Sequence, residues 1–364
     1  MKIAITVCRP WAIIHRFQSL LLNATEHDVL CIGPKPGARR EQLTKELCAG
    51  AGVPLVHPPL AKERMYGLLD SFGPDVVYGE AINEPFEMWA QQWAGEHHKV
   101  GAVLDHTQFT GKPVSDMWLE YMKAIPNSVL MVTHKEREEE CGKAVAVGAP
   151  ELDLIHDCMP VLKTTHSKIL ALFVGLWWYD RRAMQDDERS LLKPLFEIAQ
   201  GEGWQVYIHT HGGERVMSNS SGPEGLTFSQ RYDYLLELQN WGGKFVGDYA
   251  GQIGYLDFLP INSYELMLSA DCIIGTVLSP WWKACALRKK YIFMGTERTK
   301  HYFLKECGGY VMPMVNVETD DKFYALIRHT MKSNSIDVKV PQEFIDKYFM
   351  GLDGKCWERM LALC

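Results

Sequence analysis

No apolar run in the sequence approaches the roughly 20 residues that a transmembrane helix needs. Residues 1–22 also lack the basic-then-apolar layout of a signal peptide, because Arg9, Pro10, His15 and Arg16 interrupt them. We therefore expect a cytoplasmic protein that does not insert into a membrane. The chain has no low-complexity tract, and its 47% hydrophobic and 23% charged residues argue against a disordered or fibrous protein.

Several catalytic and metal-binding motifs are missing. Without G-x-x-x-x-G-K-[ST] or a complete G-x-G-x-x-G, ATPase and simple dehydrogenase functions lose their usual support, and G-x-S-x-G and H-E-x-x-H are absent too. The ten cysteines include no C-x-x-C pair, and Cys31 and Cys272 lie in apolar runs, so we expect buried, reduced thiols. We expect no bound metal and no cofactor. The net charge of −7 argues mildly against non-specific binding to nucleic acid, without excluding a local basic cleft.

The chain does contain a repeated alternation of short β-rich runs with longer helical stretches. Strands are predicted at 2–7, 28–32, 75–79, 100–104, 128–132 and 144–147, and then at 168–174, 204–209, 244–246, 271–275 and 290–294. Helices are predicted at 12–23, 40–51, 61–71, 85–95, 187–200, 229–240, 263–270, 299–306, 321–332 and 356–363, with Pro194 either kinking its helix or delaying its start. Several strands are apolar on both faces, which is typical of parallel strands covered by helices.

A chain of 364 residues exceeds the usual size of one core, and a short polar stretch at 157–167 resembles a linker. The sequence therefore predicts an α/β fold of two Rossmann-like domains, at 1–160 and 168–345, with a C-terminal helix in 346–364 packing back on the first domain. Because ligands bind beyond the carboxyl ends of parallel strands, we expect both sheets to face an interdomain cleft.

Three polar positions follow strands of the first domain. Arg9 lies between a strand and a helix, where a guanidinium and backbone amides can hold an anion together. Glu80 and Asp105 each follow an apolar strand, and His106 comes next. A carboxylate in a cleft can take a proton from an acceptor hydroxyl, although a strand-end Asp is also a common cap.

The second domain offers aromatic and basic side chains after its strands. Trp can stack on a base or a sugar, and Arg or His can contact phosphate or ribose; these candidates are Trp177, Trp178, Arg182, His209 and His211. The strongest local signal is an apolar strand that runs into a turn and a helix start, as phosphate sites at helix N-termini require. The candidates here and at the next strand end are Gly275, Thr276, Ser279, Lys283, Thr296, Glu297 and Arg298.

In order along the chain, these residues resemble the non-hydrolysing UDP-N-acetylglucosamine 2-epimerases of the GT-B superfamily. Arg9-Pro10 with Ala12-Ile13 is similar to the family's R-P-E-A-I, and the strand ending at Glu80 to its strand ending in G-D. Asp105 falls where the H-V-E-A-G-L-R-T motif has its glutamate, and Thr296-Glu297-Arg298 is similar to T-E-R-P. The resemblance implies a GT-B-like fold that binds a nucleotide-sugar.

The sequence departs from that family at groups its chemistry uses. The run D-S-G-G-x-Q-E-E is replaced by Gly275–Lys283, which has no glutamate, and H-R-R-E-N is replaced by Trp177–Arg182. A second resemblance is to phage DNA glucosyltransferases that modify hydroxymethylated cytosine. It rests on Met1–Ile5, Leu104-Asp105 and Thr299-Lys300-His301.

Three functions follow from these resemblances. The first is an inverting glycosyltransferase that moves a sugar from a UDP-sugar to a hydroxyl, with DNA carrying a hydroxymethylated pyrimidine as the leading named acceptor. The second is a divergent 2-epimerase, and the third a non-catalytic protein that binds nucleotide-sugars. The partners implied are a nucleotide-sugar and an acceptor, and the protein is expected to be a monomer or a homodimer.

Overall fold

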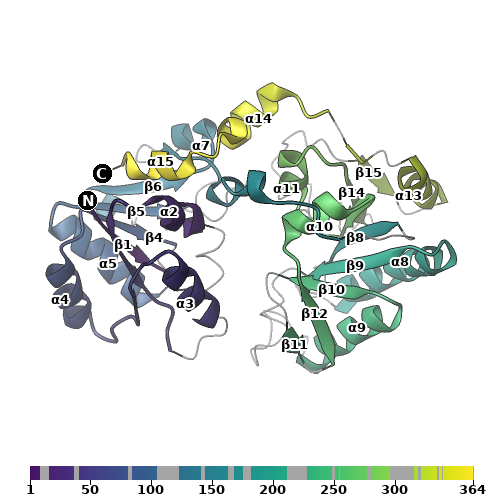
Figure 1. The fold of residues 1–364 in the computed structure, drawn as a ribbon, viewed down its shortest axis with the longest axis horizontal. Coiled ribbons are helices and arrows are strands. Elements are labelled where there is room, and N and C mark those ends of the chain that lie inside the picture. The colour runs from purple at the N-terminus through teal and green to yellow at the C-terminus, as the bar shows by residue number, and fades with distance from the viewer. Residues whose placement is uncertain are drawn as a thin grey trace. The chain divides into compact units, whose positions relative to one another are not determined.

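The computed structural model describes residues 1–8, 16–36, 41–80, 84–104, 123–140, 144–162, 168–174, 182–210, 228–247, 251–253, 255–276, 280–295, 315–318, 321–333, 336–337 and 339–363. The chain forms two compact units (Figure 1). Unit 1 comprises Met1–His156 and Pro341–Cys364, and unit 2 comprises Asp157–Val340. Unit 1 is thus built from two separate stretches of sequence, and unit 2 is inserted between them.

Unit 1 contains a seven-stranded parallel sheet in the order β3-β2-β1-β4-β5-β6-β7. Its strands are β1 (Lys2–Thr6), β2 (Asp28–Ile32), β3 (Leu55–Val56), β4 (Val76–Gly79), β5 (Val100–Leu104), β6 (Ser128–Val132) and β7 (Ala144–Ala146). Six of the seven lie where the sequence predicts them, to within a residue at each end. The edge strand β3 has two half-buried residues, too few to give a periodic signal.

Helices cover both faces of this sheet, as apolar parallel strands require. They are α2 (Gln18–Asn23), α3 (Glu41–Gly50), α4 (Lys62–Phe72), α5 (Pro85–Glu96) and α7 (Lys135–Glu140), with 3₁₀ turns at Pro150–Leu152 and Ile155–Asp157. One apolar core joins α2 and α3 to one face of the sheet. A second core joins α4 and α5 to the other face.

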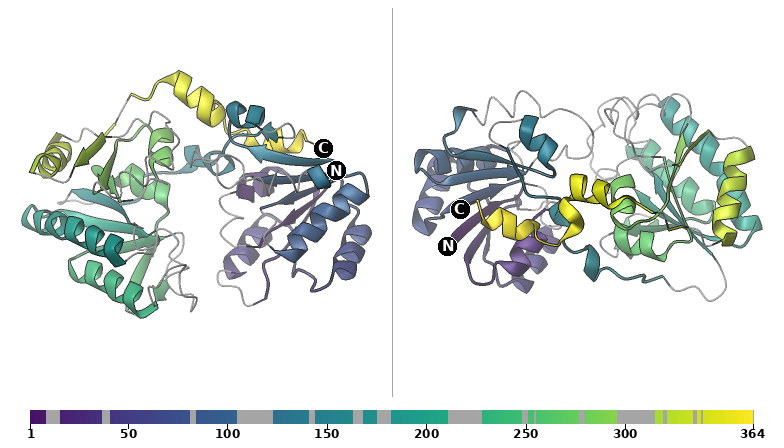
Figure 2. Two further views of the ribbon diagram at one scale, coloured as in Figure 1. Left: turned by 180° about the vertical axis from the view of Figure 1, so that it is seen from behind. Right: turned by 90° about the horizontal axis from the view of Figure 1, so that it is seen from above.

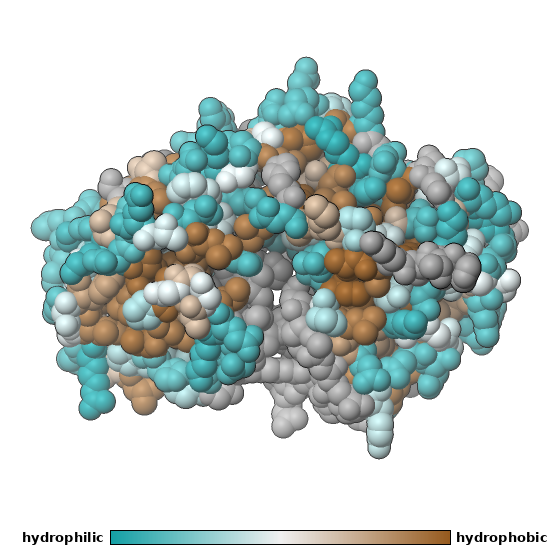
Figure 3. Space-filling view, in the orientation of Figure 1, coloured by the Kyte–Doolittle hydropathy of each residue, from teal (hydrophilic) through white to brown (hydrophobic). Residues whose placement is uncertain are grey.

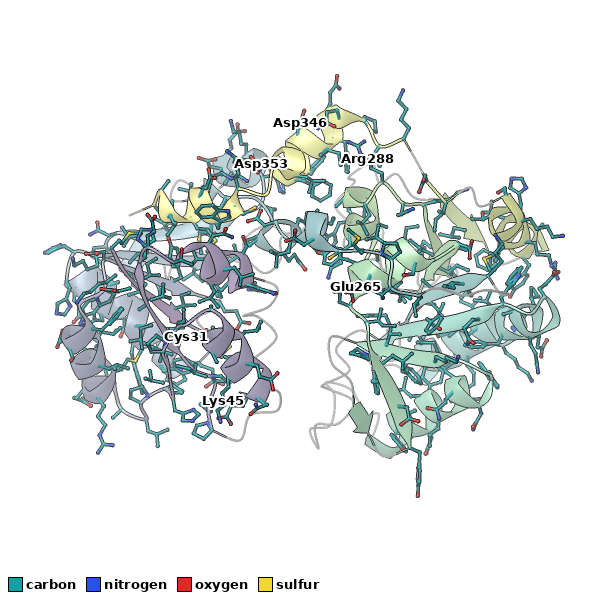
Figure 4. All side chains as sticks on the ribbon, viewed as in Figure 1. Cys31, Lys45, Glu265, Arg288, Asp346 and Asp353 are labelled. Carbon is teal, nitrogen blue, oxygen red and sulfur yellow. The ribbon has the colours of Figure 1, made fainter. Side chains whose placement is uncertain are left out.

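The stretch after Pro341 completes unit 1. It forms α14 (Gln342–Phe349), a 3₁₀ turn (Met350–Leu352) and α15 (Cys356–Leu361). The buried hydroxyl of Tyr78, on β4, donates to the backbone oxygen of Met360 at 2.5 Å. Asp353, labelled in Figure 4, receives two hydrogen bonds from Arg359. The helix α15 packs beside α2, so the two marked chain ends lie close together in every view (Figure 2).

Unit 2 contains an eight-stranded sheet in the order β11-β12-β10-β9-β8-β13-β14-β15. Its strands are β8 (Ile169–Val174), β9 (Gln205–Thr210), β10 (Lys244–Gly247), β11 (Gly251–Ile253), β12 (Leu256–Pro260), β13 (Cys272–Gly275), β14 (Tyr291–Gly295) and β15 (Val315–Glu318). All pairings are parallel except that of the edge strand β11 with β12. The strands β11, β12 and β15 are not among those predicted from the sequence.

The helices of unit 2 are α8 (Arg182–Gly201), α9 (Phe228–Asn240), α10 (Ser263–Ser269), α11 (Trp281–Ala286) and α13 (Asp321–Ser333). Buried side chains of α8, α9 and α13 form one core with the sheet. The helix α8 begins at Arg182 and contains Pro194, so the alternative that it starts later than residue 187 is wrong. The missing amide of a proline costs one backbone hydrogen bond, while α8 buries Leu191, Leu192 and Leu195 against the sheet. The predicted helix at 299–306 lies outside the described residues.

None of the described cysteines forms a disulfide, and the prediction of buried, reduced thiols is confirmed for Cys31, Cys48, Cys272, Cys285 and Cys356, whereas Cys8 and Cys158 are half-buried. Burial raises the pKa of the Cys272 thiol to about 12, so it stays protonated at neutral pH.

None of the helices in the described ranges combines the length and hydropathy of a membrane-spanning segment. On each unit, hydrophobic colour lies in patches between hydrophilic side chains (Figure 3).

Candidate functional site

Each sheet contains a point where the direction of winding reverses, and ligands of open parallel sheets bind beyond the carboxyl ends of the strands at this point. In unit 1 it lies between β1 and β4, since β2 follows on one side and β5 on the other. In unit 2 it lies between β8 and β13.

In unit 1, Glu80 leaves the sheet beside the end of β1, because Thr6 pairs with Gly79. Its carboxylate is fully buried, and Oε2 accepts a hydrogen bond from Cys8 Sγ at 3.4 Å. The Arg16 guanidinium donates to the backbone oxygen of Glu80 at 3.0 Å. The strand end is therefore fixed by hydrogen bonds to both its backbone and its side chain.

A second buried carboxylate, from Glu87 on α5, approaches the same place. Glu87 lies in the first turn of α5, and its side chain accepts the backbone N–H of Glu84 in a reciprocal capping box. Ligand atoms of Cys8, Glu80 and Glu87 all lie within 4.8 Å of one another. A thiolate with two carboxylates has the chemistry to hold a cation such as Zn²⁺. That this protein needs no metal stays a prediction.

In unit 2, β13 ends at Gly275 and Thr276. A Cβ at Gly275 would overlap the hydroxyl of Tyr291, so packing requires glycine there. Thr276 is fully buried, and its N–H donates to the backbone oxygen of Phe173 at 2.9 Å. Its hydroxyl donates to the carboxylate of Glu188 on α8. The Thr276 side chain therefore points into unit 2, where it holds the strand end in place.

Lys283 lies in the first turn of α11, two residues after Trp281 begins the helix. Its Nζ donates to Ser263 Oγ at 3.2 Å. The same ammonium lies 4.8 Å from the ring centre of Tyr264 and 5.4 Å from that of Trp282. Cation–π contacts of this kind contribute about 0.5–2 kcal/mol and hold the ammonium in a defined place.

His209 is half-buried near the end of β9, with its ring 5.3 Å from that of Phe173 on the neighbouring strand β8. Arg182 is the first residue of α8. The remaining predicted site residues lie outside the described part of the chain; they are Arg9, Asp105, His106, Trp177, Trp178, His211, Ser279, Thr296, Glu297 and Arg298.

Four groups near these strand ends are not among the predicted site residues: Cys8, Glu87, Glu188 and Tyr234. Only Glu87 had a local signal, because Glu84-Pro85 followed by Glu87 has the spacing of a capping box at a helix start. Glu188 contacts Thr276, and Tyr234 contacts Glu188, only through the packing of α8 and α9. No spacing along the chain indicates such a contact.

No protein-family profile matches the sequence, and no curated protein sequence matches it. Among solved structures, UDP-N-acetylglucosamine 2-epimerase from Rickettsia bellii is similar, with a TM-score of 0.55 and 11% identity over 100% of this chain and 95% of that one. The UDP-GlcNAc 2-epimerase from Methanocaldococcus jannaschii, in complex with UDP-GlcNAc and UDP, is also similar. Its TM-score is 0.52, with 13% identity over 100% of this chain and 99% of that one.

A third similar structure is that of Anabaena HepE in complex with UDP-glucose, with a TM-score of 0.53 and 11% identity over 100% of both chains. At such identities the likeness shows the fold alone. The chain therefore has a GT-B-like fold of two Rossmann-like domains, and the resemblance to the 2-epimerases is confirmed. The resemblance to phage DNA glucosyltransferases stays a prediction.

Proposed function

We propose that the protein is a glycosyltransferase that moves a sugar from a UDP-sugar to a hydroxyl acceptor. One observation carries the proposal: the fold matches, over the full chain, structures that hold UDP-GlcNAc with UDP and UDP-glucose. Transfer is favoured over epimerisation because Gly275–Lys283 has no glutamate where the 2-epimerase motif has two. The reaction would be inverting, with the acceptor oxygen attacking the anomeric carbon opposite the leaving diphosphate.

The proposed roles divide between the units. Unit 2 would bind the donor, with the turn after Thr276 and the cation of Lys283 stabilising the diphosphate as it leaves. Unit 1 would supply the general base, for which Asp105 is the first candidate and Glu80 the second. The hydroxyl proton passes to that carboxylate as the new C–O bond forms and the bond to the diphosphate breaks. This chemistry requires no metal, so activity should survive EDTA.

Epimerisation is the second candidate, favoured by the fold of the two epimerases and by a carboxylate, Glu80, at the end of β4. A non-catalytic nucleotide-sugar-binding protein is the third. Among acceptors, hydroxymethylated pyrimidine in DNA is our leading choice, although the net charge of −7 counts against it. Cell-surface polysaccharide and small molecules are the alternatives.

One experiment separates these functions. The pure protein is incubated in D₂O with UDP-glucose or UDP-N-acetylglucosamine, with hydroxymethylcytosine DNA, with unmodified DNA, or without an acceptor. Mass spectrometry should show sugar on the hydroxymethylated DNA alone. Deuterium at the second sugar carbon without any acceptor would indicate epimerisation instead. Binding of UDP-sugars with neither product, after other acceptors are tried, would leave the non-catalytic protein.

A further inference from the structure

A buried carboxylate in unit 2 connects the end of β13 to two helices. Glu188, on α8, is fully buried among apolar side chains of the unit 2 core. One of its oxygens accepts the hydroxyl of Thr276, and the other accepts the hydroxyl of Tyr234, on α9, at 2.8 Å. Thr276 and Tyr234 are fully buried as well. The network thus ties a strand end to α8 and α9 from inside the unit.

Burying a carboxylate costs free energy of desolvation unless it is hydrogen-bonded. An apolar side chain would fill the same place in the core at a lower free-energy cost. Hydrogen bonds to a charged group are shorter and stronger than neutral ones, and they fix geometry. Burial, followed by the neighbouring Glu188 carboxylate, raises the pKa of Tyr234 well above its usual range, so its hydroxyl remains a donor. The result is a rigid support for whatever follows Thr276.

The supported position lies where the winding of the unit 2 sheet reverses. Gly275 pairs with Phe173 on β8, and the backbone N–H of Thr276 bonds to the oxygen of the same Phe173. Main chain and side chain of Thr276 are therefore both fixed by atoms of unit 2. A strand end that is held in place at this point can support a ligand bound beyond the edge of the sheet.

We propose that Glu188 is a positioning residue for nucleotide binding: through Thr276 it fixes the end of β13, beside which the phosphates of the UDP-sugar would bind. The proposal rests on the proposed function, because it assumes that unit 2 binds a UDP-sugar. Glu188 itself touches no ligand in this proposal. Its effect is on the placement of the backbone at Gly275 and Thr276, and a misplacement of about 1 Å at a bound phosphate group can lower affinity and rate severely.

The test measures UDP and uridine affinity for four variants of the full chain by calorimetry and competition. Glu188→Gln weakens the hydrogen bond between Thr276 and Glu188, and Thr276→Val removes it. Thr276→Ser keeps a hydroxyl at this position. The control is Tyr324→Phe, which removes another hydroxyl that donates to α8, at the Leu191 oxygen 3.4 Å away. Circular dichroism and urea titration establish that each variant is folded at the assay temperature.

We expect Glu188→Gln and Thr276→Val to lower UDP affinity about tenfold or more, with uridine affinity changed by less than about threefold. Thr276→Ser and Tyr324→Phe should bind UDP within about threefold of the wild type. If Glu188→Gln and Thr276→Val are folded and bind UDP like the wild type, the inference is overturned while the proposed function stands. Equal loss of UDP and uridine affinity, which indicates general damage to the unit, would overturn the inference as well.

If Glu188→Gln does not fold, the comparison of Thr276→Ser with Thr276→Val decides, since serine has a hydroxyl on Cβ where valine has two methyl groups. Equal UDP affinity of these two proteins overturns the inference. A wild-type protein that binds neither UDP nor a UDP-sugar contradicts the proposed function, and the inference falls with it. The two failures are therefore distinguished by the wild-type measurement.

Discussion

The carboxylate of Asp153 accepts the backbone N–H of Cys356 at 3.1 Å, across 203 residues of sequence. It also accepts the N–H of Trp357 at 3.2 Å and the hydroxyl of Ser19 at 2.7 Å. Asp153 thus satisfies amides at the start of α15, as a capping side chain does, and ties α15 to α2. One side chain joins the two stretches of sequence that make up unit 1.

Replacing Asp153 should loosen this junction. We expect Asp153→Ala to lower the free energy of unfolding by about 1–3 kcal/mol, because a helix cap and a buried hydrogen bond are lost. Urea titration followed by tryptophan fluorescence measures the change. Glu358→Gln, an exposed change on the same helix, serves as the control. Equal stability of wild type and Asp153→Ala would show that α15 is held by apolar packing alone.

The pair Asp353–Arg359 should make stability depend on pH. The Arg359 guanidinium binds both carboxylate oxygens, at 2.8 and 3.0 Å, and holds the pKa of Asp353 below its usual range. A carboxyl group whose pKa is lowered in the folded state stabilises the fold at pH values above its usual pKa of about 3.9. This stabilisation is lost as the pH falls through the folded-state pKa. Because Asp353 is 39% exposed, the effect should stay below about 1 kcal/mol.

The melting temperatures of wild type and Asp353→Asn, measured side by side, check this. Their difference should be constant from about pH 7 to 5 and shrink below about pH 4. A difference that stays undiminished as the pH falls through the folded-state pKa of Asp353 would mean that its side chain acts through its shape, not through its charge.

Substitutions at Gly275 and Tyr291 should have strongly non-additive effects on the free energy of unfolding. A methyl group at Gly275 overlaps the Tyr291 hydroxyl, so we expect Gly275→Ala to destabilise the protein by about 1–3 kcal/mol. Tyr291→Phe removes that hydroxyl, and the double variant should recover part of the loss. A double-mutant cycle from urea titrations gives the coupling energy. Additive effects would contradict the packing explanation.

The proposed base should be revealed by amide substitution. Asp105→Asn keeps the size of the side chain but removes a proton acceptor, so turnover should fall by about 10²–10⁴-fold with donor affinity almost unchanged. Steady-state kinetics and calorimetry with the UDP-sugar measure the two effects. Near-normal turnover would instead assign the role to Glu80, which Glu80→Gln tests. A large loss of folding stability would make Asp105 a structural cap.

Lys283 has both a proposed ligand role and observed contacts. If it binds the diphosphate, Lys283→Ala should weaken UDP-sugar binding by about 1–3 kcal/mol. Lys283→Met preserves most of the packing against Tyr264 and Trp282 while removing the charge, and it should weaken binding to a similar extent. Calorimetry with unchanged affinity, together with a lower stability of Lys283→Ala alone, would confine Lys283 to those ring contacts.

The sequence predicts the fold where a strand is long and apolar, as for Val100–Leu104, or where glycine and proline bound a helix. It misses β12, whose alternation of buried Leu256, exposed Asp257 and buried Phe258 is a strand pattern only four or five residues long. It finds Glu80 and Thr276 because both follow strands. Which groups those two side chains contact depends on helix packing, and local spacing contains no information about that.

The insertion of unit 2 within unit 1 has a consequence for synthesis in the cell. A ribosome makes all of Asp157–Val340 before it makes the helix that Asp153 caps. At about 5–20 residues per second this interval lasts roughly 10–40 seconds. During that time the side of α2 that α15 will cover, and the hydroxyl of Tyr78, face solvent or chaperones. The unit that begins first is therefore completed last.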